Sequence, residues 1–204
     1  MQKEYILRSL QSFVVIPILA TSFTLSPMNF VEKIPTVAVL ANVQNGTLSN
    51  EALDNKQKDL EEKAQKIDAY FGKYNLPLEG HGKEFVLAAE KNNLPWALVA
   101  AIGMAESTGC KFIIKGTNNC FGWGGGTIPF DSIDDAIATI SEHLGGNNQH
   151  TDQYYSGKDV VGILHAYNPE EIAPGYAKHV QNIMQRIENF QTDNLADTAT
   201  KKSA

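Results

Sequence analysis

The chain has 204 residues, of which 43% are hydrophobic and 20% are charged, a composition typical of a globular domain. Its formal net charge of −6 argues against a protein that binds nucleic acid, because neutralising phosphates requires clustered Lys and Arg. The two cysteines and five histidines show no metal-binding spacing such as His-Glu-x-x-His, so neither a metal nor another cofactor is expected.

The N-terminus has the pattern of an export signal. Lys3 and Arg8 precede a run without charged residues over positions 9–31. The small-residue sequence that ends at Ala41 resembles a cleavage site, which predicts a signal peptide over residues 1–41, and an uncleaved membrane anchor through 9–31 is the alternative. In both cases we expect the rest of the chain to be exported, either secreted or held at the cell envelope.

Residues 42–74 are expected to form a polar linker and a charged helix. From Glu51 to about Tyr74, charges alternate in sign and a narrow apolar stripe recurs at helical spacing. The stripe consists of Leu53, Leu60, Ile67 and Phe71. This helix is either a spacer or the first helix of the domain. A second helix is predicted from Gly82 to Asn92.

Residues 97–110 form an almost wholly apolar run that contains one carboxylate, Glu106. Pro95 suits the first turn of a helix and Gly109 suits a left-handed cap, so Glu106 is predicted to lie in the last turn. Desolvation and the negative end of the helix dipole both favour the neutral form of a carboxyl group there. A neutral carboxylic acid can donate a proton, although a solvated glutamate or a surface ion pair is the ordinary interpretation.

A glycine- and asparagine-rich loop follows at residues 115–129 and carries Phe121 and Trp123. Its glycine spacing fits neither the dinucleotide-binding fingerprint nor the phosphate-binding loop of nucleoside triphosphatases. The two aromatic side chains are either core residues or a platform for the apolar face of a sugar. The glycines favour a ligand-facing loop, because glycine permits close backbone approach, and the segment leaves room for a short hairpin.

The two cysteines, Cys110 and Cys120, bracket the start of this loop. Export favours a disulfide between them, and two separate buried thiols are the alternative. A bond here would close a short loop beside Glu106, with a modest entropic gain.

Three more helices are predicted, and no long alternating strand pattern occurs, so the domain is expected to be mainly α. Their approximate ranges are Ser132 to Leu144, Lys158 to Ala166 and Gly175 to Phe190, with a polar connection through Tyr154 and Tyr155. The tail, residues 191–204, is polar and expected to be disordered. Asp131, Asp134 and Asp135 lie at the start of the first of these helices, where capping is their usual role and catalysis the alternative.

Three segments occur in a characteristic order: Ala105-Glu-Ser107, Asn119-Cys-Phe-Gly-Trp-Gly124 and Ala166-Tyr-Asn168. Together they resemble the lysozyme-like superfamily of peptidoglycan-cleaving enzymes. The closest likeness is to soluble lytic transglycosylases with goose-type lysozyme, and to bacterial endo-β-N-acetylglucosaminidases. The resemblance covers about residues 75–190 and implies a lysozyme-like helical catalytic domain with a buried central helix.

The resemblance also implies a role for each matching residue. Glu106 corresponds to the catalytic acid and Tyr167 to the tyrosine that orients its carboxyl group. The substrate-binding positions that it implies are Ser107, Asn119, Phe121, Gly122, Trp123 and Asn168. The chain departs from the transglycosylases in having Trp-Gly where they usually have Met-Gln, and Pro-Glu-Glu after Ala-Tyr-Asn where Ala-Gly is common.

The resemblance thus implies cleavage of peptidoglycan glycan strands at β-1,4 bonds between N-acetylmuramic acid and N-acetylglucosamine, with one glutamate as general acid and base. A lytic transglycosylase reaction is favoured. A hydrolytic endo-β-N-acetylglucosaminidase and a non-catalytic peptidoglycan-binding module are the alternatives.

Overall fold

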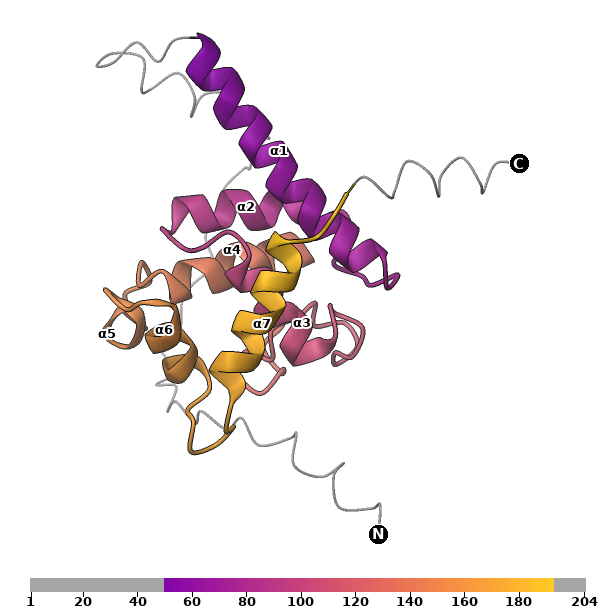
Figure 1. The fold of residues 1–204 in the computed structure, drawn as a ribbon. Coiled ribbons are helices and arrows are strands. Elements are labelled where there is room, and N and C mark those ends of the chain that lie inside the picture. Colours follow the sequence, from indigo (N-terminus) through magenta and orange to yellow (C-terminus); the bar gives the residue numbers. More distant parts are fainter. Residues whose placement is uncertain (1–49, 193–204) are drawn as a thin grey trace, which may run out of the picture.

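The computed structural model describes residues 50–192, and within this range the chain forms helices and no strand. The mainly helical class predicted from the sequence is therefore confirmed (Figure 1). The helices are α1 (Asn50–Gly72), α2 (Gly82–Lys91), α3 (Leu98–Ser107), α4 (Ile133–Leu144), α5 (Asp152–Tyr155), α6 (Val160–Tyr167) and α7 (Tyr176–Glu188). The segment considered as a membrane anchor, 9–31, lies outside the described residues.

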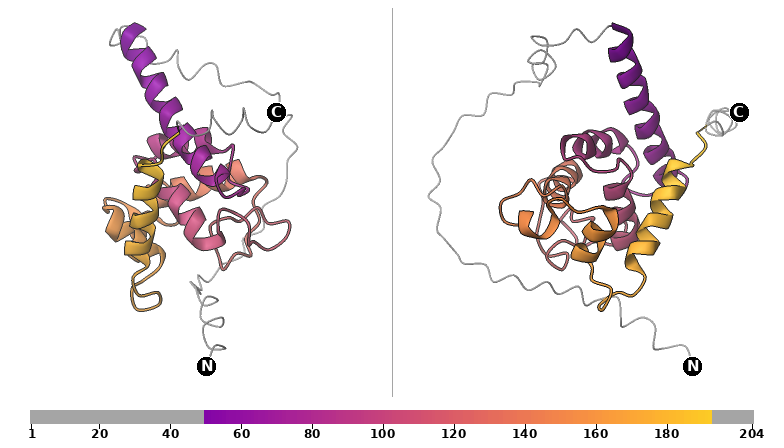
Figure 2. Two further views of the ribbon diagram at one scale, coloured as in Figure 1. Left: turned by 45° about the vertical axis from the view of Figure 1, so that its right-hand side comes forward. Right: turned by 60° about the vertical axis from the view of Figure 1, so that its left-hand side comes forward.

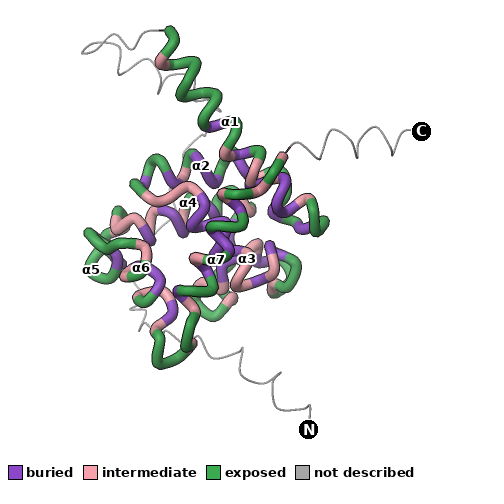
Figure 3. The backbone as a smooth tube through the Cα atoms, in the orientation of Figure 1, coloured by how far each residue is buried: buried purple, intermediate pink, exposed green. Residues whose placement is uncertain are grey.

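Helix α3 is the centre of the fold. Every residue from Leu98 to Gly103 is buried, because a helix that is apolar on all sides must be covered by its neighbours. It packs against α2, α4 and α7, and buried residues gather where these helices meet (Figure 3). The helix begins three residues after Pro95 and ends at Ser107, with Thr108 in the left-handed conformation (φ 54°). The left-handed cap therefore begins one residue before the expected Gly109.

Helix α1 contributes only its second half to the core. Buried side chains begin at Leu60 and include Ile67 and Phe71, whereas Leu53 is 44% exposed. The first half projects beyond the other described helices (Figure 2). The second half of α1 is therefore packed as the first helix of the domain would be, and the first half is not.

The remaining helices lie close to their predicted ranges. Ser132 caps α4, its hydroxyl oxygen accepting a hydrogen bond from the Asp135 amide at 3.0 Å. Helix α5, a single turn, falls in the segment predicted as a polar connection, which is too short to show helical periodicity.

The loop between α3 and α4 contains turns and no hairpin strands in the described chain. Gly122, Gly124, Gly125 and Gly126 all have positive φ, which interrupts extended backbone. In the described part of the molecule, no helix is both long and apolar enough to cross a membrane, and no group of three or more metal-ligating side chains occurs.

Candidate active site

Glu106 lies in the last turn of α3, where the sequence places it. Its Oε1 atom accepts a hydrogen bond of 2.6 Å from the hydroxyl of Tyr176. Tyr176 is the first residue of α7, directly after Gly175, whose φ of 80° turns the chain into this helix. The contact joins two helices that pack against each other, α3 and α7.

The surroundings of Glu106 favour its protonated form. Burial raises the pKa of the Glu106 carboxyl group, and the hydrogen bond from Tyr176, which stabilises the charged form, opposes part of this rise. Burial and the neighbouring Tyr167 and Glu106 raise the pKa of Tyr176, so its hydroxyl remains a donor at neutral pH. The pair therefore combines a carboxyl group that can hold a proton with a donor that fixes its orientation.

Gly122 brings the backbone of the loop against the other oxygen of this carboxyl group. A Cβ atom at this position would lie 2.8 Å from Glu106 Oε2, and the φ of Gly122 is 66°. Both the contact and the conformation require glycine. The predicted site residue Gly122 is thus adjacent to the predicted acid.

Asn119 organises the loop from within. Its Oδ1 accepts the Trp123 amide at 3.0 Å, and its Nδ2 donates to the carbonyl oxygens of Trp123 (2.8 Å) and Ile128 (2.9 Å). The side chain is buried and its amide is engaged on both sides. Asn119, predicted to bind substrate, therefore shapes the loop that carries Trp123.

Ser107 and the two cysteines attach the loop to the end of α3. Cys110 and Cys120 form the disulfide that the sequence favours, with Cα atoms 4.5 Å apart. The buried Ser107 hydroxyl lies 2.7 Å from the Cys120 carbonyl oxygen and accepts the Cys110 amide at 2.8 Å. Ser107 is thus positioned to hold the disulfide loop rather than to face a ligand.

Tyr167 is expected to orient the Glu106 carboxyl group, but the structure gives this contact to a different tyrosine. The Tyr167 hydroxyl donates to the carbonyl oxygen of Phe121, and the hydroxyl that contacts Glu106 is that of Tyr176. The two tyrosine rings stack, with centroids 6.2 Å apart and an interplanar angle of 11°. Tyr167 therefore fixes the loop and supports Tyr176.

Beside Glu106 lies a series of four partly buried rings, which we call the aromatic row: His143, Trp123, Tyr167 and Tyr176. Centroids are 4.9 Å apart between His143 and Trp123, and 5.9 Å apart between Trp123 and Tyr167. Trp123 is partly exposed, as a ligand-facing wall would be. The row ends at Glu106 through the Tyr176 hydroxyl.

Two other predicted substrate-binding residues are buried. Phe121 is fully buried and packs edge-on against Phe85, so it is a core residue whose backbone serves the site. Asn168 is 8% exposed, and its Oδ1 has no hydrogen-bond partner among the described residues. A buried amide oxygen without a partner is unfavourable, and Asn168 therefore remains a candidate for contact with a ligand.

Of the aspartates near the loop, Asp135 takes part in helix capping and Asp134 forms a hydrogen bond with His81. The Asp135 carboxylate accepts the amide of Asp131 at 3.2 Å, and Asp134 lies 2.5 Å from His81 Nδ1. The capping interpretation therefore fits Asp135, whereas Asp134 bonds to the residue that precedes α2.

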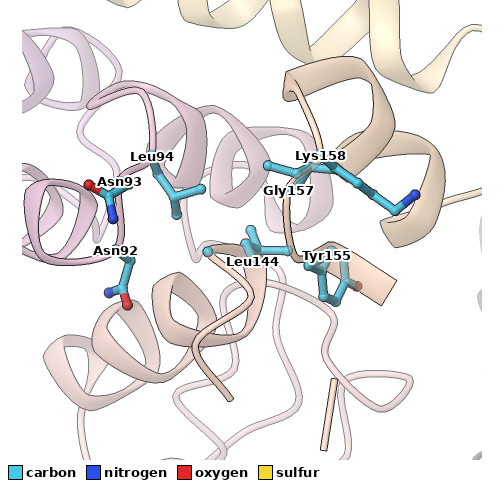
Figure 4. Close-up of a pocket in the computed structure, with 9 residues that line it drawn as sticks. Asn92, Asn93, Leu94, Leu144, Tyr155, Gly157 and Lys158 are labelled. Atoms are coloured by element: carbon cyan, nitrogen blue, oxygen red, sulfur yellow. The ribbon is translucent and has the colours of Figure 1, made fainter. Parts of the chain in front are cut away.

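A separate pocket of about 260 Å³ lies between the α2–α3 turn, the end of α4 and the turn after α5. In Figure 4 the amide groups of Asn92 and Asn93 and the ammonium group of Lys158 point away from the apolar side chains of Leu94 and Leu144. Its polar side chains therefore do not converge on a common point.

Comparison with protein-family models, with curated proteins and with solved structures gave no match to this chain. The geometry around Glu106 is therefore the basis for a functional proposal.

Proposed function

We propose that this chain cleaves peptidoglycan glycan strands at β-1,4 bonds between N-acetylmuramic acid and N-acetylglucosamine, in the manner of a lytic transglycosylase. The observation that carries the proposal is the Glu106 carboxyl group, held by Tyr176 at Oε1 and facing the Gly122 backbone at Oε2. Its raised pKa suits a general acid, which must carry a proton near neutral pH.

In the proposed reaction Glu106 protonates the glycosidic oxygen as the bond to the anomeric carbon breaks. The carboxylate that results is stabilised by the Tyr176 hydroxyl. Glu106 then accepts a proton from the 6-hydroxyl of the same sugar as that oxygen attacks the anomeric carbon. The product carries a 1,6-anhydro ring, and Glu106 regains its proton.

The contacts of the nearby aspartates support a mechanism with one carboxyl group. Asp134 lies against His81, and the carboxylate of Asp135 is bound to a backbone amide. The substrate's own hydroxyl or N-acetyl oxygen then takes the place of a second protein carboxylate. The Trp123 wall and the glycine-rich backbone suit the apolar face of a sugar ring.

The test is incubation of purified peptidoglycan with the wild-type chain and with Glu106→Gln, followed by mass spectrometry of the released fragments. Glu84→Gln, at an exposed position on α2, is the matched control. We expect 1,6-anhydro products from the wild type and the control, and none from Glu106→Gln. Undiminished cleavage by Glu106→Gln would end the assignment.

The same experiment separates the alternatives. An added water at a reducing N-acetylglucosamine end would indicate a hydrolytic endo-β-N-acetylglucosaminidase. A wild-type chain that sediments with the wall without releasing fragments would indicate a binding module.

A further inference from the structure

His143 is a residue near the candidate site to which neither the sequence nor the proposed reaction assigns a role. It lies in the last turn of α4, and its ring packs against the Trp123 indole with centroids 4.9 Å apart and an interplanar angle of 35°. Tyr167 covers the indole at 5.9 Å, also at 35°. Trp123 therefore has two ring neighbours that come from different helices.

The His143 ring is itself held in place. Its Nδ1 atom lies 2.8 Å from the hydroxyl oxygen of Thr151, a buried residue at the N-terminal end of α5. The end of α4 and the start of α5 thus fix the imidazole. A fixed ring can in turn restrict the indole that packs on it.

We propose that His143 is a positioning residue that holds the Trp123 indole in one orientation against Tyr167, so that Trp123 presents a constant wall to a sugar ring. The role for sugar binding rests on the proposed function, and the control of the indole by His143 stands without it.

The charge state of His143 bears on this packing. Burial lowers the pKa of the imidazole, the carboxylate of Glu142 on the same helix raises it, and His150 in the following turn adds to the lowering. The neutral ring is therefore favoured at neutral pH. Protonation gives both ring nitrogens a hydrogen, so that Nδ1 can only donate to the Thr151 hydroxyl oxygen, and it places a cation against the indole.

The proposal predicts that substrate binding and chemistry respond differently to substitution. His143→Ala uncovers one side of Trp123 and is expected to raise KM about three- to tenfold, since a ring pair contributes modestly beyond its buried area. The kcat value should change less, because the Glu106–Tyr176 contact lies at the other end of the aromatic row. His143→Phe keeps a ring and should have a KM close to that of the wild type, whereas His143→Gln should have a raised KM like that of His143→Ala.

Fluorescence gives a readout that does not require cleavage. In a Trp96→Phe background Trp123 is the single tryptophan of the chain, and imidazolium quenches indole emission more strongly than neutral imidazole. As the pH is lowered, we expect Trp123 emission to decrease in one step that coincides with the NMR titration of the His143 ring. The step should be absent in His143→Phe, with far-UV circular dichroism confirming that each variant folds.

Two outcomes would overturn the positioning role. One is a Trp123 emission that is independent of pH through the His143 titration. The other is emission and near-UV circular dichroism unchanged by His143→Ala. Failure of the proposed function leaves this test intact, because loss of cleavage in every variant does not alter the fluorescence of Trp123.

Discussion

The hydroxyl of Tyr176 donates a hydrogen bond of 2.6 Å to Oε1 of Glu106, joining the last turn of α3 to the first residue of α7. Seventy positions separate the two residues in the sequence. The orientation of the proposed acid therefore depends on how two helices pack, and several measurable consequences follow from the surroundings of this pair.

Tyr176→Phe removes the hydroxyl and should raise the pKa of Glu106, because the hydrogen bond favours the charged carboxylate. A hydrogen bond to a charged group is worth about 1.5–3 kcal/mol, and its loss leaves the raising effect of burial unopposed. The alkaline limb of the rate profile for peptidoglycan cleavage should move upward, while the maximal rate falls through loss of orientation. A limb that stays in place or moves downward would contradict the assigned contact.

Gly122→Ala should impair activity far more than it impairs stability. The new methyl group would meet Glu106 Oε2 at 2.8 Å and displace the carboxyl group. Gly125→Ala is the matched control, because Gly125 also has a positive φ (69°) but a methyl group added there would meet no atom within 4 Å. Urea unfolding should show that the free energy of unfolding falls by a similar amount, about 1 kcal/mol, in both variants. Equal activities of the two variants would show that the close approach of Gly122 to Glu106 does not matter for cleavage.

Glu106→Gln should stabilise the protein at neutral pH. A pKa raised above the ordinary 4.5 means that the folded state holds its proton more tightly than the unfolded state, so stability is lost as pH rises from about 4.5 through the folded-state pKa. Glutamine lacks this dependence and can still accept from Tyr176. Thermal unfolding across pH 3.5–8 should show a gain for the variant that grows with pH and vanishes at the acid end. A gain that is constant across this range would exclude ionisation of Glu106 as its cause.

Reduction of the Cys110–Cys120 disulfide should destabilise the protein by about 2–3 kcal/mol, the loop-closure entropy expected for a ring of this size. Denaturant unfolding with and without reductant measures this difference, and the Cys110→Ala/Cys120→Ala double variant is the control without a bond. Reductant should leave the double variant unaffected. Identical unfolding curves of the oxidised and reduced wild type would show that Ser107 and the surrounding core hold the loop unaided.

The sequence predicts the parts of the site that depend on local chemistry. Glu106 lies in the last turn of α3 because Pro95 and Gly109 flank an apolar run, and these two residues are readable without a structure, although the left-handed cap itself begins at Thr108. The disulfide between the two cysteines is favoured by the expected export of the chain. The helical periodicities locate most helices to within a few residues.

Contacts between distant segments are less accessible to sequence reasoning. Tyr176 lies on the apolar side of its helix and has the pattern of a core residue, and only the packing of α7 on α3 brings its hydroxyl to Glu106. Ser107 and Asn119 are polar residues near an acid, a pattern that suggests ligand contact. In the folded chain they satisfy backbone groups instead, which no local pattern distinguishes.

The first half of α1 has a mechanical consequence. Residues 50–59 precede the first buried side chain, Leu60, and are nearly all exposed. Lys56 forms an ion pair with Glu90 of α2, and Asp59 forms one with Lys63 of the same helix. At 1.5 Å per residue these ten positions make a rigid arm about 15 Å long. A helical arm transmits direction as well as distance, unlike a flexible tether. The arm thus holds Asn50, where the described chain begins, about 15 Å from the first buried residue of α1.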